Sequence, residues 1–320
     1  MSSKHCDSSV RLNLSMTFSI LFFLMVLVSI TACDQSSQSQ SSQTPQYGDS
    51  STLDSKPVYR FAIHPLHNPR KLTEVYQPLI NQLNAKIPSV HFQVEASRDY
   101  QAYEMKFRAR EAEFLLPNPW QTLEAIKVGY SVIAMAGNAE DFKGIFVVRN
   151  DSGIKVPTDL KGKKVSCPSP TALAACIMPH QYLHNHGVNV QADIEKLYVG
   201  SQESSIMNTA LGSVAAGATW PPPWRAFQKD HPEDAAKLKV IWETPHLLNN
   251  SVMVRKDVPA NIRDQVKQIL HDLHKTPAGQ ELLNGMETAR FHPADDGTYD
   301  KVRQFVARFE KEVRPVEVKK

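Results

Sequence analysis

The stretch from Cys167 to Cys176 contains the residues whose types and spacing most suggest chemistry. Ser169 and Thr171 carry hydroxyl groups, alternate with prolines, and stand directly before an alanine- and leucine-rich run that begins at Ala172. Small hydroxyl residues before an apolar helical run are typical N-caps. The first N–H groups of a helix have no intrahelical partner, and the helix dipole adds partial positive charge there. The pattern therefore predicts either an ordinary helix cap or an anion-binding helix start.

The cysteines allow a second kind of chemistry. Cys6 and Cys33 lie in an N-terminal leader, which leaves Cys167 and Cys176 in the folded part. An even pair outside the cytoplasm can form a disulfide, and two buried free thiols are the alternative. Nearby histidines also allow a Cys–His nucleophile, because a helix start would lower the pKa of Cys167. No residue fixes a third catalytic group.

Residues 1–33 have the pattern of a bacterial lipoprotein signal peptide. A basic flank precedes an apolar run over residues 16–30, and small residues then lead to Cys33, as in a lipobox. We expect lipidation of Cys33. The run is short for a spanning helix, which needs about 20 apolar residues, and a retained transmembrane anchor is the alternative. Residues 34–57, rich in serine and glutamine, predict a flexible tether.

Composition excludes several functions. The net charge of +3 is spread along the chain without a basic block, so we expect no nucleic-acid partner. The sequence has no P-loop, no dinucleotide-binding glycine cluster and no Gly-x-Ser-x-Gly, so we expect neither an enzyme nor a cofactor. His180 and His184 have zinc-ligand spacing, but no third ligand is evident and we expect no metal.

The folded part alternates short apolar strands with amphipathic helices, which predicts an α/β protein with mostly parallel sheets. We expect lobe 1 to comprise residues 58–148 and 249–320, and lobe 2 residues 149–248. Two crossings between the lobes would form a hinge, and the cleft would lie at the carboxyl ends of the strands. The prolines between Trp220 and Trp224 predict an extended segment whose tryptophans either face the cleft or pack structurally.

The chain resembles the periplasmic solute-binding proteins of the phosphate/phosphite/phosphonate class, which serve ABC importers and, in some relatives, sensor kinases. The resemblance spans residues 59–313. The segments that carry it are FAIHP (61–65), YQPL (76–79), DY (99–100), FVVRNDSG (146–153), DLKGKKV (159–165), GS (200–201) and NSVMVR (250–255). It implies the two-lobed, hinged type II binding-protein fold.

The resemblance also implies the ligand-binding positions. They are Tyr100, Asn118, Ser169, Thr171, Ala172, Gln202, Glu203, Thr219 and Trp220. Phosphonate-binding relatives usually show Ser-Thr-Ser-Gly at the helix start, a histidine at the position of Gln202, and an aspartate near Thr219. A buried polar group without its partner costs about 1–3 kcal/mol. We therefore expect an altered oxyanion, or a phosphonate-like organic anion with an apolar part facing Trp220 and Trp224.

The sequence is compatible with three alternative functions. The first is a lipid-anchored, extracytoplasmic, monomeric solute-binding protein that captures a small oxyanion and delivers it to an ABC permease in the membrane. The second is the ligand-sensing partner of a membrane sensor kinase, and the third is a cell-surface thiol enzyme that uses Cys167. Ligand contact with both lobes would close the hinge in either of the first two.

Overall fold

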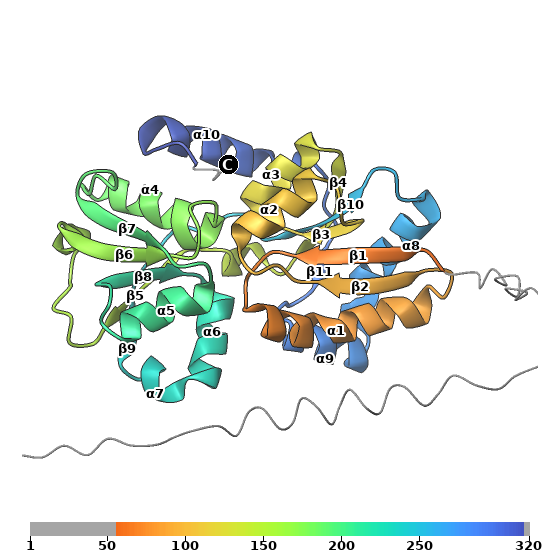
Figure 1. Cartoon of the computed structure of the whole chain (residues 1–320), viewed down its shortest axis with the longest axis horizontal. Helices are drawn as coiled ribbons and strands as arrows, with labels where there is room; N and C mark the ends of the chain where they lie inside the picture. Colours follow the sequence, from red (N-terminus) through yellow and green to blue (C-terminus); the bar gives the residue numbers. More distant parts are fainter. Residues whose placement is uncertain (1–55, 317–320) are drawn as a thin grey trace, which may run out of the picture. The chain divides into compact units, whose positions relative to one another are not determined.

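The computed structural model describes residues 56–316 and shows two β-sheets, each covered by helices (Figure 1). The expected signal peptide, the lipidated Cys33 and nearly all of the expected tether lie outside the described residues. Between residues 56 and 316, no helix is long and apolar enough to cross a membrane.

The first sheet has six strands in the order β11-β4-β10-β3-β1-β2. These strands are β1 (Val58–Ile63), β2 (His91–Glu95), β3 (Phe114–Leu116), β4 (Tyr130–Ala136), β10 (Ser251–Arg255) and β11 (Phe291–His292). β1 pairs in parallel with β2 and β3, whereas β10 runs antiparallel between β3 and β4. The sheet is therefore mixed rather than mostly parallel, because the chain returns from the second sheet in the opposite direction.

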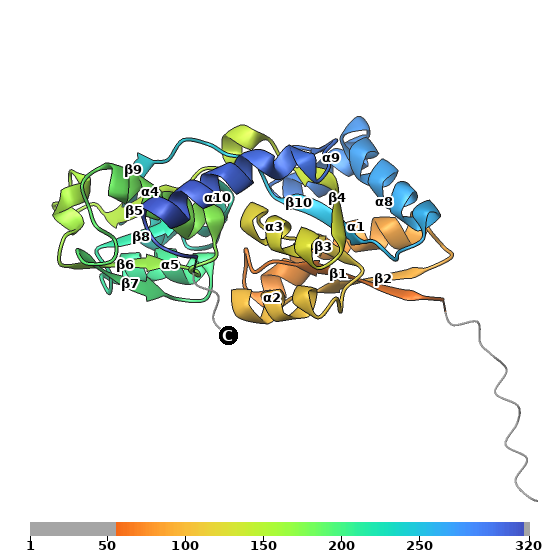
Figure 2. The same cartoon turned by 90° about the horizontal axis from the view of Figure 1, so that it is seen from above.

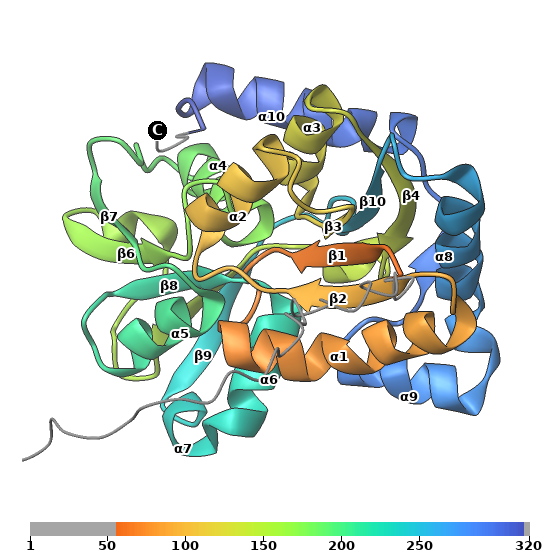
Figure 3. The same ribbon diagram turned by 45° about the vertical axis from the view of Figure 1, so that its right-hand side comes forward.

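Helices cover both faces of this sheet. They are α1 (Pro69–Lys86), α2 (Tyr100–Arg108), α3 (Pro119–Lys127), α8 (Ala260–Asp272), α9 (Pro277–Gly285) and α10 (Asp300–Glu312). Figure 3 shows α1 and α9 on one side of β1 and β2, with α2 and α3 on the other. Successive side chains of a strand point to opposite faces, so Phe114 and Leu116 join one apolar cluster and Leu115 joins the other. We call this unit lobe 1.

The second sheet has five strands in the order β7-β6-β8-β5-β9. They are β5 (Ile145–Arg149), β6 (Lys163–Cys167), β7 (Ile194–Tyr198), β8 (Ala216–Thr219) and β9 (Leu238–Glu243). The expected boundary placed residues 144–148 in lobe 1, and this is wrong for β5. That strand pairs antiparallel with both β8 and β9, so the chain has already crossed into the second unit, lobe 2, before Ile145.

The helices of lobe 2 correct two expectations. They are α4 (Met178–Asn185), α5 (Gln202–Ala210), α6 (Pro221–Asp230) and α7 (Pro232–Ala235). The prolines after Trp220 form the first turn of α6 rather than an extended segment, because the first turn of a helix needs no N–H donors. The helix expected from Ala172 begins with a π-helical turn, η3 (Leu173–Ile177), before α4 continues it.

Four single 3₁₀ turns complete the described elements: η1 (Ala139–Asp141), η2 (Pro157–Leu160), η4 (Leu273–Lys275) and η5 (Gly297–Tyr299). The lobes share one apolar cluster, in which Leu173, Ile177 and Met178 of lobe 2 pack with side chains of α2, α3 and α10. Figures 1 and 2 show α10 beside both α3 and α4, and Gln181 of α4 donates a hydrogen bond to Glu312 of α10. The C-terminal helix therefore joins the two lobes.

Candidate functional site

A cavity of about 380 Å³ lies between the lobes. Lobe 1 contributes the start of α2, and lobe 2 contributes the loops at the carboxyl ends of β6 and β7. The lining residues are Asp99, Tyr100, Gln101, Glu104, Pro168, Ser169, Pro170, Thr171, Tyr198, Val199 and Gly200. The corner after residue 168 thus faces a gap between the lobes, and the volume is that of a small-ligand site.

The loop from Pro168 to Thr171 presents its two hydroxyl groups to this cavity. Ser169 Oγ and Thr171 Oγ1 are 2.9 Å apart, and the Thr171 N–H donates to Ser169 Oγ at 3.3 Å. The Ala172 N–H donates to the Ser169 carbonyl at 3.1 Å. Two amides expected to face a ligand are therefore already bonded within the turn, and the side chains of Ser169 and Thr171 remain as the donors of this loop.

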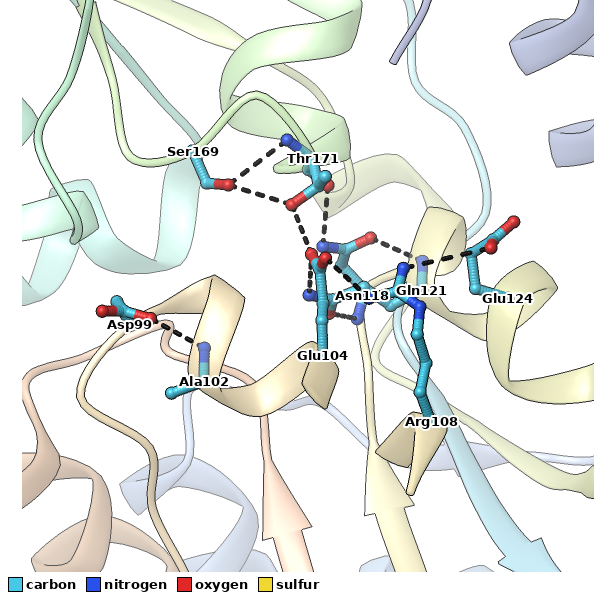
Figure 4. A network of polar contacts seen from close by, with 9 residues as sticks. All are labelled: Asp99, Ala102, Glu104, Arg108, Asn118, Gln121, Glu124, Ser169 and Thr171. Carbon is cyan, nitrogen blue, oxygen red and sulfur yellow. Dashed lines mark hydrogen bonds and ion pairs between the residues drawn. The ribbon is translucent and has the colours of Figure 1, made fainter. Parts of the chain in front are cut away.

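Glu104 of α2 faces these hydroxyls and is not among the residues expected from the sequence. The residue is only 3% exposed, and its carboxylate accepts hydrogen bonds from Thr171 Oγ1 at 2.6 Å and from Gln121 Nε2 at 3.2 Å (Figure 4). Arg108 pairs with it at 3.3 Å. Burial raises the pKa of the Glu104 carboxyl, and these three partners offset part of the rise. An ionised Glu104 would repel an anion in the cavity, whereas a protonated one could donate to it.

The signal that could have identified Glu104 is its spacing. Tyr100 and Glu104 are four residues apart, so a helix that begins at Tyr100 places both on one face. The Asp99 side chain fixes this start by accepting the Ala102 N–H at 2.8 Å. The cap therefore aims both side chains at lobe 2.

Asn118 lies behind the loop rather than in the cavity. It caps α3, with Oδ1 accepting the N–H groups of Trp120 and Gln121 at 3.0 and 3.1 Å. The other side of its amide donates from Nδ2 to the Thr171 carbonyl at 3.1 Å. One buried side chain therefore stabilises a helix of lobe 1 and holds the loop of lobe 2.

These two roles of Asn118 can be separated by mutation. Asn118→Ala removes both and is expected to lower the free energy of unfolding by about 1–2 kcal/mol, the usual loss for a cap. Asn118→Asp keeps the cap acceptor but removes the Nδ2 donor, so we expect most of that stability to remain while the unliganded lobes separate more. Urea denaturation measures the first effect and the radius of gyration in solution the second. Equal radii for Asn118→Asp and the wild type would contradict the inter-lobe role.

Gln202 also contacts the lining from behind. Its Nε2 donates to the Tyr100 hydroxyl at 3.1 Å, and its Oε1 accepts from Thr219 Oγ1 at 2.9 Å. Burial raises the pKa of Tyr100, so this phenol stays protonated. Because the Tyr100 oxygen accepts from Gln202, its own proton is oriented away from that amide and can be donated into the cavity.

The remaining expected site residues lie elsewhere. Ala172 is buried in a cluster with the two cysteines. Glu203 accepts from Asn68 and His231 at a second contact between the lobes. Trp220 packs against Phe142 with ring centroids 5.5 Å apart. Of the nine expected positions, Tyr100, Ser169 and Thr171 line the cavity, Asn118 and Gln202 bond to lining residues, and Thr219 bonds to Gln202.

Cys167 and Cys176 are joined by a disulfide, with Cα atoms 5.3 Å apart. The alternative of two free thiols is therefore wrong, and the thiol-enzyme hypothesis loses its nucleophile. His180 lies beside the bond, with Nε2 3.7 Å from Cys167 Sγ. These three residues form a candidate metal group by position, but sulfurs bonded to each other are not thiolate ligands. His180 is buried whereas His184 is exposed, so the expected spacing does not make a zinc face either.

Comparison with known proteins decides the family. The family model of the ABC transporter, phosphonate, periplasmic substrate-binding protein matches residues 61–299. The chain belongs to this family. The phosphonates-binding periplasmic protein of Escherichia coli (strain K12) is 20% identical over 252 residues, which cover 76% of this chain and 74% of that protein. The family comprises substrate-binding proteins rather than enzymes, and it is periplasmic.

Solved structures confirm the type II binding-protein fold. The binding component of an ABC phosphonate transporter from Pseudomonas aeruginosa matches with a TM-score of 0.75 at 15% identity, covering 80% of this chain and 88% of that one. PhnD1 from Prochlorococcus marinus (MIT 9301), solved in complex with methylphosphonate, matches with a TM-score of 0.74 at 19% identity, covering 80% and 99%. At these identities the likeness concerns the fold alone.

Proposed function

We propose that the protein captures a small oxyanion of the phosphonate type between its lobes and delivers it to an ABC permease. The observation that carries this proposal is the placement of the Ser169 and Thr171 hydroxyls on an inter-lobe cavity, opposite the Tyr100 hydroxyl, in a chain of this family. Three hydroxyl donors from two lobes suit a group with three oxygens. Contact with both lobes gives the closed state the differential affinity that hinge closure requires.

The ligand has to change two existing contacts. Thr171 Oγ1 donates its proton to Glu104, so the bond between the two hydroxyls uses the proton of Ser169 Oγ. Ligand oxygens that accept these two protons replace the Glu104 carboxylate and Thr171 Oγ1 as acceptors. The Tyr100 proton needs no such exchange, because the Gln202 bond uses the phenol oxygen only as an acceptor. Among the described residues that line the cavity there is no lysine, arginine or histidine, while Asp99 and Glu104 are present. Recognition therefore rests on hydroxyl donors and on the protonation of Glu104.

A panel of anions tests this function. Methylphosphonate, phosphite, phosphate, sulfate and methanesulfonate are each added while thermal unfolding is followed. A phosphonate-type anion is expected to stabilise the protein by about 2.7 kcal/mol at a concentration of 100 Kd. Thr171→Ala should lose most of this stabilisation, while Thr158→Ala, which removes an exposed hydroxyl of lobe 2, should keep it. No stabilisation of the wild-type protein by any of these anions would remove the proposal.

We also propose that the mature protein is anchored by lipid on Cys33 and that residues 34–57 let the lobes reach the permease. The lipobox pattern and the periplasmic family support this. Membrane fractionation and mass spectrometry of the mature N-terminus should show a diacylglyceryl-modified Cys33. Cys33→Ser is expected to abolish the modification. An unmodified Cys33, or an intact Met1, in the wild-type protein would contradict lipid anchoring.

A further inference from the structure

Arg314 lies just beyond the end of α10, and its side chain is buried, with only 2% of the residue exposed. The guanidinium is spread over several acceptors. Its Nε donates to His180 Nδ1 at 3.2 Å, one terminal nitrogen donates to the Pro315 carbonyl at 2.9 Å, and the other approaches the Pro170 carbonyl at 3.4 Å. It also lies 5.3 Å from the centre of the Phe309 ring. Such a cation is held in one position by its surroundings.

His180 is in the right state to receive this contact. Burial and the nearby Arg314 cation hold its pKa well below the usual range, so the imidazole is neutral. Because Nδ1 accepts from Arg314, the proton is on Nε2, which faces Cys167 Sγ at 3.7 Å. Arg314, His180 and the disulfide therefore form one buried cluster behind the loop from Pro168 to Thr171.

The contact at Pro170 matters because of peptide geometry. A trans peptide is planar, with its carbonyl and N–H pointing in opposite directions. Holding the Pro170 carbonyl therefore also orients the Thr171 N–H, which bonds to Ser169 Oγ. Asn118 holds the next carbonyl, that of Thr171. The side chains of Arg314 and Asn118 thus orient two consecutive peptide groups of the loop from Pro168 to Thr171. Neither residue belongs to the segment 145–243 that forms the sheet of lobe 2.

Arg314 also connects the loop to the other lobe. It follows α10, which contacts α3 of lobe 1 and whose Val302, Val306 and Phe309 belong to the apolar cluster shared by the lobes. The fork of a guanidinium can bind several acceptors in one plane, which the single ammonium of a lysine cannot do. One terminal nitrogen of Arg314 reaches the loop backbone at the Pro170 carbonyl, 3.4 Å away.

We propose that Arg314 is a positioning residue: from the C-terminal segment, it holds the loop of Ser169 and Thr171 in the conformation that binds the oxyanion. This rests on the proposed function for its ligand. It assigns to residues 313–316 a part in the binding site, although they are far from that loop in sequence and do not line the cavity. Without Arg314 the loop opens locally, and its hydroxyls lose their common direction.

Hydrogen exchange of the unliganded protein tests the proposal without any ligand. In Arg314→Met, the amides of residues 169–176, apart from Pro170, are expected to exchange at least tenfold faster, while the sheet of lobe 2 stays protected. Arg314→Lys keeps the positive charge and should show a smaller acceleration of exchange in the same segment. It also serves as the test variant if Arg314→Met does not fold. Arg308→Met removes an exposed arginine of α10 and should match the wild type. Unchanged exchange in residues 169–176, or acceleration spread evenly over lobe 2, would overturn the proposal.

Titration with methylphosphonate adds the link to binding. If the wild-type protein binds it, Arg314→Lys is expected to raise Kd at least tenfold, with Arg308→Met unchanged. An unchanged Kd in Arg314→Lys, beside faster loop exchange, would also overturn the positioning role. If the wild-type protein binds no anion, the proposed function fails instead, and the exchange measurement still decides whether Arg314 holds the loop.

Discussion

Replacing Glu104 by glutamine is expected to tighten the binding of a phosphonate-type oxyanion by about tenfold or more at pH 7. The Glu104 carboxyl accepts from the Thr171 hydroxyl at 2.6 Å, so a bound anion would lie close to a like charge whenever Glu104 is ionised. At an effective dielectric constant of 20, two charges 4 Å apart interact by about 4 kcal/mol. The Arg108 pair at 3.3 Å offsets part of this, and about 1.4 kcal/mol corresponds to tenfold in Kd. The glutamine amide keeps an acceptor for Thr171 and adds a donor for the ligand.

The Glu104→Gln substitution should also change how ligand affinity depends on pH. Burial already raises the Glu104 pKa, and a bound anion would raise it further. Ligand binding therefore takes up a proton between the two pKa values, and wild-type affinity increases as pH falls through that window. The ligand's own titration is common to both proteins, so the difference between wild type and Glu104→Gln reports Glu104 alone. Arg108 and Glu124, the neighbouring charges of this network, are present in both.

Calorimetric titration with methylphosphonate in two buffers of different ionisation heat measures both effects. The wild-type protein should take up a fraction of a proton more than Glu104→Gln. Glu124→Gln is the matched control. Glu124 is the other carboxylate near Arg108, and unlike Glu104 it does not line the cavity. Equal Kd values and equal proton uptake in wild type and Glu104→Gln would show that Glu104 does not face the bound ligand.

The sequence could predict the elements that follow from local chemistry. Apolar runs bounded by prolines gave β3 and β6, and hydroxyl residues before an apolar run located the loop at Ser169 and Thr171 correctly at the edge of the cavity. The strand β5 was assigned to the wrong lobe because pairing partners are not local. The three prolines after Trp220 were expected to be extended, since proline in general favours that conformation, but helix starts accept it.

The residues missed share one property, which is that tertiary contacts make them important. Glu104 stands in a helix with Lys106 and Arg108, a pattern typical of a solvated face, and only packing against α3 and lobe 2 buries it. Arg314 follows the last helix, where a basic residue usually interacts with the helix dipole at the surface. Its burial depends on tertiary packing against His180, Phe309 and the Pro170 carbonyl, and no periodicity in the sequence encodes that packing.

Removing the disulfide by the double change Cys167→Ala and Cys176→Ala is expected to lower the free energy of unfolding by about 2–3 kcal/mol. The two cysteines are separated by 9 positions, and closing a loop of this length reduces the entropy of the unfolded chain by roughly this amount. Alanine is chosen because both positions are buried and a serine hydroxyl would add its own burial cost. Urea denaturation of oxidised wild type, reduced wild type and the variant measures the loss, and reduced wild type should approach the variant.

Oxyanion affinity in the same variant separates two ways of holding the ligand loop. The bond encloses residues 168–175, so it limits the conformations of the loop in the unfolded chain and the native one alike. If the native loop depends on it, methylphosphonate affinity should fall together with stability. If Arg314 and Asn118 hold the Pro170 and Thr171 carbonyls on their own, stability should fall while Kd changes less than about threefold. We expect the second result, because both contacts act on the loop backbone directly. A stability unchanged by the double substitution would contradict a covalent link between Cys167 and Cys176 in solution.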